Sequence, residues 1–588
     1  MRWDLSVLVK EVNVDKIKEE LNEMVRAALV IKEIYSGRIK GFDSKGILEL
    51  LKSLDAFLIE FDGVSSYCSL RYAADSTDAT AKQLNEALRN AYVKVGQALA
   101  FIEIELGQLL LERPDLIYSL DLHDYRHYLE RIRLRAPYHL TEEIEQLIIV
   151  KDRNGINAWS QLHNDWLGTK SFQITIDGIE KELSYGEAVG LFTSPNRELR
   201  KLAYSCILRT LAKDEVLFSS ALRAICSDYI IMCNYRKFPQ PITPSLLAND
   251  IDMETLVSLL KVVENKTELY RQYLRIKAKL LNVEKLGIWD LMAPLPSDGD
   301  ATYKWMEARK LITKAFSDFD PDFGRWIEEM YVARRIDGEV RRGKSPGAFC
   351  HTWLTGKGAF ILQSFNGRLT DVYTQAHELG HAIHAYLYTR EQPPLNCEIG
   401  SCIAECGSTF GELLLTERLL AEAKNVSEKK AALVTVLDEF GLSVFQVAAR
   451  YWFEEGLYKL LQDEKLLDGD TLKKMWCDCL RKIFGDDVEL LPETCYDWIR
   501  PPHYYIANYR FYNFPYIFAQ LFVFSLYRLY KEQGKNFVPK LKVLLAAGAS
   551  RAPKDLARDL GYDISSMEFW EKGMRQAEEF LDSLKKTL

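Results

Sequence analysis

The sequence contains His377-Glu378-Leu379-Gly380-His381, which matches the H-E-x-x-H pattern. On a helix, His377 and His381 lie about 40° apart around the axis and one turn, about 6 Å, along it. Two imidazoles at this spacing can bind one Zn²⁺ through bonds of about 2.1 Å. Glu378 lies beside them and can accept a proton from an attacking water. The pattern therefore indicates metal-assisted hydrolysis.

A catalytic zinc also needs a third protein ligand and an open position. The segment IAECGSTFGELLL places Glu405 and Glu412 seven residues apart, on one face of a predicted helix. The distance along the chain from His381 to Glu405 is enough for a loop and a returning helix. We predict that Glu405 is the third ligand, and that Glu412 accepts a hydrogen bond that orients one of the histidines.

Other side chains near the motif offer alternative ligands. His384 shares the helical face, but it lies seven residues, about 10.5 Å, from His377. We interpret His384 as a buried polar group or a supporting group rather than a ligand. Three cysteines are a rival source of ligands, although their spacing matches no C-x₂-C pattern and thiolates usually close a structural site. These are Cys397, Cys402 and Cys406.

A segment rich in aromatic residues, PPHYYIANYRFYNFPY, lies further along the chain. It contains His503, Tyr504, Tyr505, Tyr509, Tyr512 and Tyr516. We expect most of these rings to pack in the core. A peptidase also needs a hydrogen-bond donor for the developing oxyanion and groups that contact a peptide backbone. Imidazole and phenol groups suit both roles.

The pattern around the motif predicts the elements that position it. Val372, Ala376, Leu379 and Ile383 cluster on the helical face opposite the histidines, which would anchor the helix in a core. The preceding stretch, 346–367, predicts a β-hairpin around a Thr-Gly-Lys-Gly turn. These features place a metal-binding helix directly after a small sheet.

The rest of the chain predicts a helix-rich protein of two parts. Ile47, Leu50, Leu51, Leu54 and Leu58 form an apolar stripe at helical spacing within an N-terminal region of amphipathic helices. A short hairpin is predicted at 172–183, around an Asp-Gly turn. We expect a boundary near residue 190, with a helical arm or lid at 1–190 and the catalytic domain at 191–588.

The composition supports a helix-rich protein and argues against a nucleic-acid-binding one. The 588 residues are 48% hydrophobic and 27% charged, and only 32 are glycine and 18 proline, which favours helices. The net charge of −8 gives no basic footprint for nucleic acid. The densest basic run, at 334–344, alternates with acidic residues and predicts a solvated loop.

The location is also predicted from composition. The N-terminus lacks the apolar core of a signal peptide, and the longest apolar stretch, 516–527, is too short to span a membrane. The 11 cysteines are odd in number and scattered, which indicates thiols in a reducing cytoplasm. We therefore expect a cytoplasmic protein that does not bind membranes.

Several ordered motifs carry a wider resemblance. They are WDLMAPLP at 289–296, SPGAFC at 345–350, FILQSFNGRLTDVYTQAHELGHAIH at 360–384, AECGSTFGE at 404–412 and LGYDISSMEFW at 560–570. With these motifs the chain resembles the thimet-type oligopeptidase family, in its oligoendopeptidase F branch. The resemblance covers most of the chain and is strongest from about residue 200 onward.

The resemblance implies a mainly α, two-lobed zincin-type metallopeptidase that encloses a deep channel, with a small β-hairpin or sheet beside the active-site helix. It implies one Zn²⁺ per chain and endopeptidase action on short unstructured peptides. Carried over by position, His377, His381 and Glu405 would be the metal ligands and Glu378 the general base.

The same resemblance implies that His503 and Tyr509 donate hydrogen bonds in the transition state, and it leaves Tyr505, Tyr512 and Tyr516 as candidates for substrate contact. The chain departs from the family in two places. Its Glu-Cys-Gly-Ser at 405–408 replaces the common Glu-Val-Ala-Ser, and FPYIFAQ replaces the glycine that often follows the tyrosine cluster.

Two other functions fit the residues. A zinc carboxypeptidase would need a cationic group for the free C-terminus of its substrate, and no single arginine stands out in the sequence. An inactive peptide-binding protein is the other alternative, against which the intact Glu378 argues.

Overall fold

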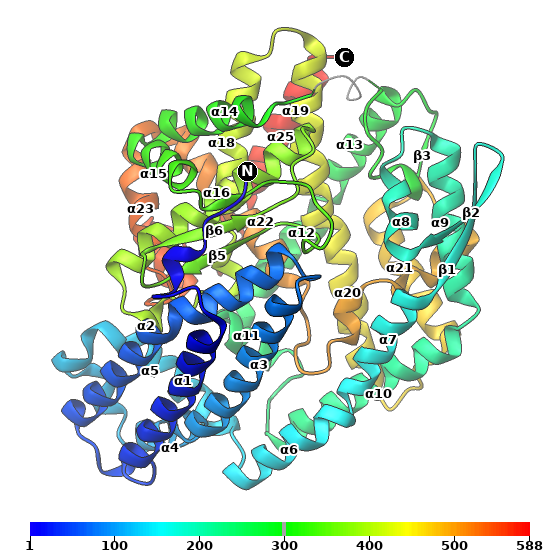
Figure 1. Ribbon diagram of the computed structural model, residues 1–588. Coiled ribbons are helices and arrows are strands. Elements are labelled where there is room, and N and C mark those ends of the chain that lie inside the picture. Colours follow the sequence, from blue (N-terminus) through cyan, green and yellow to red (C-terminus); the bar gives the residue numbers. More distant parts are fainter. Residues whose placement is uncertain (297–301) are drawn as a thin grey trace. The chain divides into compact units, whose positions relative to one another are not determined.

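The computed structural model describes residues 1–296 and 302–588, which are mostly helical with small sheets (Figure 1). The chain forms two compact units, each assembled from three stretches. The first unit comprises Met1–Glu142, Ala301–Ala421 and Leu526–Tyr562, and the second comprises Glu143–Asp300, Glu422–Ser525 and Asp563–Leu588. The helix-rich class predicted from the low glycine and proline content is confirmed. The predicted boundary near residue 190 stays a prediction.

The first unit holds the H-E-x-x-H motif. Its helices are α1 (Val14–Tyr35), α2 (Ser44–Ala74), α3 (Ala79–Leu99), α4 (Phe101–Glu112), α5 (Arg126–Arg135), α14 (Trp305–Phe319), α15 (Pro321–Val332), α16 (Leu369–Glu391), α17 (Ser401–Ala404), α18 (Cys406–Glu422), α23 (Val538–Ala546) and α24 (Pro553–Asp559). Its strands are β4 (Ile336–Asp337), β5 (Phe349–Trp353) and β6 (Gly358–Leu362).

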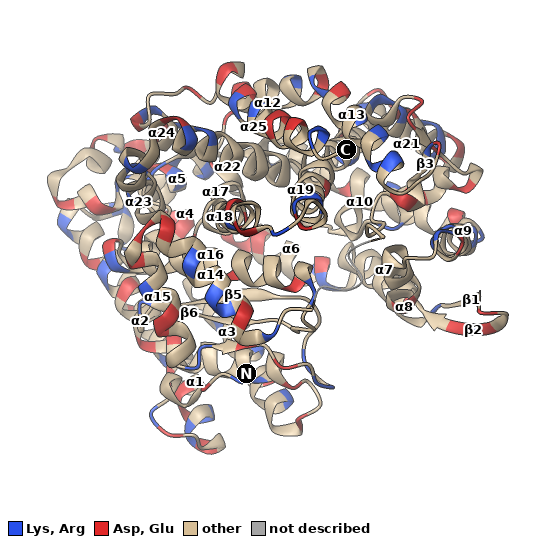
Figure 2. Cartoon of the chain, turned by 90° about the horizontal axis from the view of Figure 1, so that it is seen from above, with Lys and Arg blue, Asp and Glu red and all other residues tan. Residues whose placement is uncertain are grey.

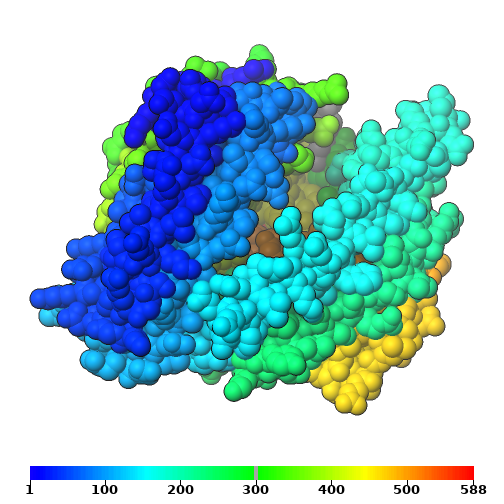
Figure 3. Space-filling model, turned by 60° about the horizontal axis from the view of Figure 1, so that its bottom comes forward, coloured from blue at the N-terminus to red at the C-terminus, as the bar shows by residue number. Residues whose placement is uncertain are grey.

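Helices α1 to α5 fold around one apolar core. The predicted stripe on α2 faces this core, where Ile47, Leu50 and Leu51 are fully buried. Phe360 and Leu362 of β6 belong to the same core, so the N-terminal helices pack against the small sheet. Figure 3 shows these helices in blue, forming one continuous surface.

The small sheet of the first unit has the order β4-β6-β5. The predicted hairpin at 346–367 is confirmed, since β5 pairs antiparallel with β6 in the register Phe349↔Leu362 to Trp353↔Gly358. Strand β4 pairs parallel with β6 on the other side. Strand β6 is fully buried, whereas β5 is an edge strand of this sheet.

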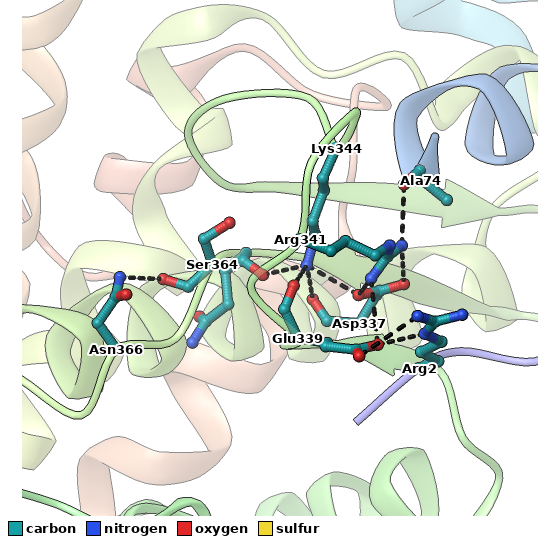
Figure 4. Close-up of polar contacts among 9 residues, drawn as sticks. Arg2, Ala74, Asp337, Glu339, Arg341, Lys344, Ser364 and Asn366 are labelled. Carbon is teal, nitrogen blue, oxygen red and sulfur yellow. Dashed lines mark hydrogen bonds and ion pairs between the residues drawn. The ribbon is translucent and has the colours of Figure 1, made fainter. Parts of the chain in front are cut away.

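The basic run at 334–344 differs from the prediction of a solvated loop. The side chains of Lys344 and Asp337 are each only 1% exposed. Lys344 Nζ donates to Asp337 Oδ1 at 2.8 Å and to the carbonyl oxygen of Glu339 at 2.9 Å, and Arg341 forms two hydrogen bonds to the Asp337 carboxylate (Figure 4). The pairing of β4 with buried β6 draws Asp337 inside, so its charge must be matched there. This network holds the segment that leads into β5.

The second unit holds the aromatic segment. Its helices are α6 (Glu142–Asn154), α7 (Asn157–Thr169), α8 (Tyr185–Gly190), α9 (Arg197–Ala212), α10 (Glu215–Tyr235), α11 (Thr243–Asn249), α12 (Met253–Asn265), α13 (Thr267–Leu280), α19 (Val426–Phe440), α20 (Val447–Gln462), α21 (Gly469–Phe484) and α25 (Met567–Lys585). Its strands are β1 (Ser171–Ile176), β2 (Ile179–Ser184), β3 (Leu286–Gly287) and β7 (Val488–Glu489). Helix α22 (Phe514–Gln533) contributes residues to both units.

The hairpin predicted at 172–183 forms from β1 and β2, around Asp177 and Gly178, which both have positive φ angles. Basic and acidic residues alternate along the backbone of both units (Figure 2). Two described helical stretches, Glu215–Tyr235 and Val426–Gln462, are long and apolar enough to cross a membrane by length and composition alone. Core helices pass the same test, and in the second stretch 61% of the apolar window is buried inside the protein.

Candidate active site

Helix α16 carries the H-E-x-x-H motif and begins at a tight turn. Gly367 has a φ of 87°, and Asp371 Oδ2 accepts hydrogen bonds from the backbone N–H groups of Arg368 at 3.0 Å and Asn366 at 2.7 Å. The acidic side chain therefore satisfies donors at the helix N-terminus. The predicted apolar face of α16 is buried, and the helix packs against β5 and β6 (Figure 1).

The structure brings His377, His381 and Glu405 together. Glu405 Oε2 lies 3.3 Å from His377 Nε2 and 3.2 Å from His381 Nε2. One ligand atom from each of the three residues lies within 4.8 Å of the other two, and the three side chains are partly exposed. Among residues 1–296 and 302–588, no other group of this kind is found.

Two side chains of α18, Glu412 and Ser408, form hydrogen bonds to the candidate ligands. The Nδ1 atom of His377 lies 2.6 Å from Glu412 Oε1, so the ring donates there and presents Nε2 to the cluster. The hydroxyl of Ser408 donates to Glu405 Oε2 at 2.6 Å. Glu412 thus makes the contact expected of a histidine-orienting group, whereas Ser408 was not singled out from the sequence. Its position three residues after Glu405, at the start of a helix, is the signal that could have identified it.

A close crossing of α16 and α18 positions Glu405. The crossing is formed by Gly380 and Gly407, where a Cβ on Gly380 would lie only 2.2 Å from the Gly407 carbonyl oxygen. A Cβ on Gly407 would lie 2.4 Å from the Gly380 carbonyl oxygen and 2.9 Å from the Cβ of His384. Only glycines allow the two backbones to approach this closely. The glycine of the motif and the glycine two residues after Glu405 therefore set the distance between the ligands.

The hydrogen bonds and charges within the cluster shift the pKa values of His377 and Glu405. Burial lowers the pKa of His377, but its hydrogen bonds to Glu405 and Glu412 outweigh this and hold it well above the ordinary value. Burial raises the pKa of Glu405, but its contacts with His377 and His381 outweigh this and hold it well below the ordinary value. The cluster therefore holds an ionised carboxylate that attracts a cation.

Glu378 lies beside the cluster and is almost fully buried. Its side chain is 5% exposed, and its Oε2 atom has no hydrogen-bond partner among the described residues. Burial raises the pKa of Glu378, and the nearby charges of His377 and His381 oppose the increase. A buried carboxylate oxygen without a partner is unusual and requires an explanation, which a proton-transfer role provides.

The donor set fits a zinc ion. Tetrahedral ligands with bonds of about 2.0–2.1 Å lie about 3.3 Å from one another. The two nitrogen–oxygen distances to Glu405 have this value. Two imidazoles and one carboxylate are also a ligand set of catalytic zinc sites, in which a fourth position stays open. His377, His381 and Glu405 could therefore hold the metal.

The alternative ligands are not members of this cluster. His384 is buried with its ring edge on Tyr388, and burial followed by the charge of His381 lowers its pKa to about 3. Cys402 and Cys406 are also buried. Burial and then the charge of Glu405 raise the pKa of the Cys406 thiol, which opposes formation of a thiolate ligand.

The aromatic segment belongs to the second unit. The ring centroid of His503 lies 5.1 Å from that of Tyr512 and 6.0 Å from that of Tyr516, and Tyr509 and Tyr512 pack edge to face at 5.1 Å. Asn249 Nδ2 donates to the Tyr509 hydroxyl at 2.8 Å. Burial and then the charge of Arg450 lower the pKa of His503 to about 4. His503 is therefore a neutral imidazole at physiological pH.

Tyr505 differs from its aromatic neighbours. It is 1% exposed, and its ring stacks on His163 of α7 with centroids 3.8 Å apart. The hydroxyl of Ser160 donates to the Tyr505 carbonyl oxygen, and His163 Nε2 lies 2.9 Å from the carbonyl oxygen of Ile499. Tyr505 therefore packs in the core and leaves no ring face for a substrate.

The site in the first unit has the form of a metallopeptidase active site, with H-E-x-x-H on α16 and a glutamate at the turn between α17 and α18. Residues 320–576 match the description "Peptidase family M3", and residues 115–168 match "Oligopeptidase F". The chain is 25% identical over 565 residues to oligopeptidase PepF of Bacillus subtilis (strain 168), over 94% of this chain and 82% of the relative.

Solved structures share the fold. A crystal structure from Chlamydophila abortus matches with a TM-score of 0.87 at 20% identity, over 100% of this chain and 98% of that one. Oligoendopeptidase-F from Enterococcus faecium matches with a TM-score of 0.70 at 22% identity, over 97% and 98% of the two chains. The protein is a metalloendopeptidase. Residues 320–576 therefore resemble peptidase family M3, and most of the chain is similar to an oligopeptidase of the F type.

Proposed function

We propose that this chain hydrolyses internal peptide bonds of short, unstructured oligopeptides, with one Zn²⁺ bound by His377, His381 and Glu405. The observation that carries the proposal is the convergence of these three ligand atoms beside the buried, unpartnered oxygen of Glu378. The name of the Bacillus relative, an oligopeptidase, supports short peptides as the substrate class.

Zn²⁺, when bound, supplies Lewis acidity, which lowers the pKa of a coordinated water and polarises the scissile carbonyl. Glu378 accepts the proton that the water loses as its oxygen bonds to the carbonyl carbon. Glu378 then passes this proton to the leaving nitrogen as the C–N bond breaks, so the products are a carboxylic acid and an amine. The raised pKa of Glu378 suits a group that must both take and release a proton near neutral pH.

His503 and Tyr509 are proposed as donors to the carbonyl oxygen as it becomes negative, as the family resemblance implies. A neutral imidazole and a phenol can each donate one hydrogen bond. The bond from Asn249 fixes the position of the Tyr509 hydroxyl, which supports a preorganised donor. Tyr512 and Tyr516, which are partly exposed, remain candidates for contact with the substrate.

Strand β5 is proposed to bind the substrate backbone. It is an edge strand of its sheet, and an extended peptide can add to such an edge through backbone hydrogen bonds. Consecutive side chains of β5 contact two different helices. His351 Nε2 lies 2.8 Å from Ser66 Oγ on α2, and Thr352 Oγ1 lies 2.7 Å from the Tyr388 hydroxyl on α16. Backbone pairing tolerates many substrate side chains.

We also propose a cytoplasmic location, because no disulfide joins any of the 11 cysteines, all of which lie in the described part of the chain. The proposed division of the chain is a helical arm at 1–190 followed by a catalytic part at 191–588.

The test is peptide cleavage by the native enzyme and by Glu378→Gln, with products mapped by mass spectrometry. We expect internal cleavage by the native enzyme, and a fall in turnover of about 10²–10⁴-fold in Glu378→Gln with zinc still bound. Glu391→Gln is the matched control, since Glu391 is an exposed glutamate at the end of the same helix. Stepwise release of C-terminal residues would instead identify a carboxypeptidase, and zinc binding without any turnover would identify a peptide-binding protein.

A further inference from the structure

Arg450, on α20, is a half-buried arginine whose charge is not matched. Among residues 1–296 and 302–588, its guanidinium makes no hydrogen bond and no ion pair. Its backbone carbonyl oxygen accepts a hydrogen bond from the Tyr504 hydroxyl at 3.0 Å, which ties this turn of α20 to the residue next to His503. A cation held partly out of water normally has a partner.

The two nearby carboxylates belong to other arginines. Glu454, one turn further along α20, pairs with Arg510 at 3.2 Å, and both side chains are 0% exposed. Glu454 also accepts a hydrogen bond from the backbone N–H of Phe511 at 2.8 Å.

Asp497 pairs in the same way with Arg500, and it also accepts a hydrogen bond from the Tyr204 hydroxyl at 3.2 Å. Three guanidinium groups therefore share two carboxylates in this region. Within the part of the chain that the structure describes, Arg450 is the one that remains unpaired.

The unpaired charge lies among residues that the proposed function places near the substrate. The burial of His503 and the charge of Arg450 together lower the pKa of that imidazole, so the two groups are within electrostatic range. The phenol of Tyr516, which is also within electrostatic range of Arg450, lies with its ring centroid 6.0 Å from that of His503. Arg450, His503 and Tyr516 thus form one polar patch that carries a positive charge.

We propose that Arg450 binds a carboxylate of the peptide substrate. The proposal rests on the proposed function, because it takes peptides as the substrate and the His503 region as a place that they contact. A guanidinium binds a carboxylate through two parallel hydrogen bonds, which gives both strength and orientation. The carboxylate is either the C-terminus of the peptide or an Asp or Glu side chain. Recognition of the C-terminus would make cleavage depend on the distance from the end of the peptide, and so favour short substrates.

The experiment compares three kinds of peptide derived from one parent sequence that lacks Asp and Glu. The first has a free C-terminus, the second has an amidated C-terminus, and the third is an amidated set in which Glu is placed at successive positions. We expect kcat/KM of the native enzyme to be at least about tenfold higher for a peptide that carries the recognised carboxylate. A preference for the free C-terminus identifies the terminal carboxylate. A preference restored by Glu in the amidated set identifies a side chain.

Arg450→Gln should bring the ratio of kcat/KM for the acid and amide peptides close to one, and Arg450→Lys should keep part of the preference, since it retains the charge but loses the planar fork. The control is Arg481→Gln, at an exposed position on α21 of the same unit, which should keep the native ratio. Equilibrium binding of the acid and amide peptides to Glu378→Gln gives the same comparison without turnover.

Equal kcat/KM of the native enzyme for all three kinds of peptide would overturn the proposal, as would a preference that survives in Arg450→Gln. The failure of the proposed function looks different, because then none of the peptides is cleaved. If Arg450→Gln misfolds, Arg450→Lys tests the assignment, because the preference should fall in that variant, and an undiminished preference would overturn the proposal.

Discussion

Gly407→Ala should weaken zinc binding although it changes no ligand. The added methyl would lie 2.4 Å from the Gly380 carbonyl oxygen, whereas ordinary contacts are 3.4–4 Å. The helices α16 and α18 must therefore separate by about 1 Å to reach normal contact. Glu405 lies two residues from Gly407 and would move with α18, but metal–ligand distances tolerate only about 0.2 Å.

We expect zinc affinity to fall by at least about 10–100-fold, the loss typical when a ligand is poorly oriented. Overpacking should also lower the free energy of unfolding by about 1–3 kcal/mol. Zinc affinity is measured by competition with a chromophoric chelator, and stability by urea unfolding of the zinc-free and zinc-bound protein.

The matched control is Gly96→Ala, at an exposed position on α3 where a Cβ meets nothing within 4 Å. This change should stabilise the protein by about 0.5–1 kcal/mol, because alanine is the better helix former, and should leave zinc affinity unchanged. If Gly407→Ala behaves like Gly96→Ala, the helix crossing does not position Glu405 and the reasoning is refuted.

Three further predictions concern the third zinc ligand, the hydroxyl of Tyr509 and the buried carboxylate of Asp337. Glu405→Ala should release zinc and Cys406→Ala should retain it, as measured by elemental analysis; the reverse result would assign the ligand to the cysteine. Tyr509→Phe should lower kcat by about 10²–10³, or ~2.7–4 kcal/mol, with KM and zinc content little changed; normal turnover with a lower melting temperature would show that the ring only packs. Burial raises the pKa of Asp337, but its hydrogen bonds to Arg341 and Lys344 outweigh this and hold it below the ordinary value. Its contribution to folding is therefore present above about pH 4 and is lost as the pH falls through the lower folded pKa. Urea unfolding at pH 7 and pH 3 should show less acid destabilisation in Asp337→Asn than in the native protein, and equal acid destabilisation would contradict this account.

Local spacing was sufficient to predict much of the site. The four-residue step between His377 and His381 places both rings on one face of α16, because this follows from helix geometry alone. The apolar residues opposite them are buried, and the hairpin before them forms in the predicted stretch. These features depend on residues close in sequence, whose relative positions are set by helix and strand geometry.

The contacts between distant segments could not be predicted in this way. Nothing in the local pattern shows that Gly380 and Gly407 face each other. The burial of Lys344 was missed for the same reason, since alternating charges look solvated until the neighbouring strand is known.

By itself, the sequence determined which residues could bind a metal, the helix that carries two of them, and the hairpin before it, because these follow from periodicity. Only the tertiary structure decided that Glu405 lies 3.2–3.3 Å from both histidines, and that no carboxylate in the described part of the chain pairs with Arg450. Those outcomes depend on how closely two backbones can pack and on which charges pair. Both are properties of elements far apart in the chain, and no local pattern encodes them.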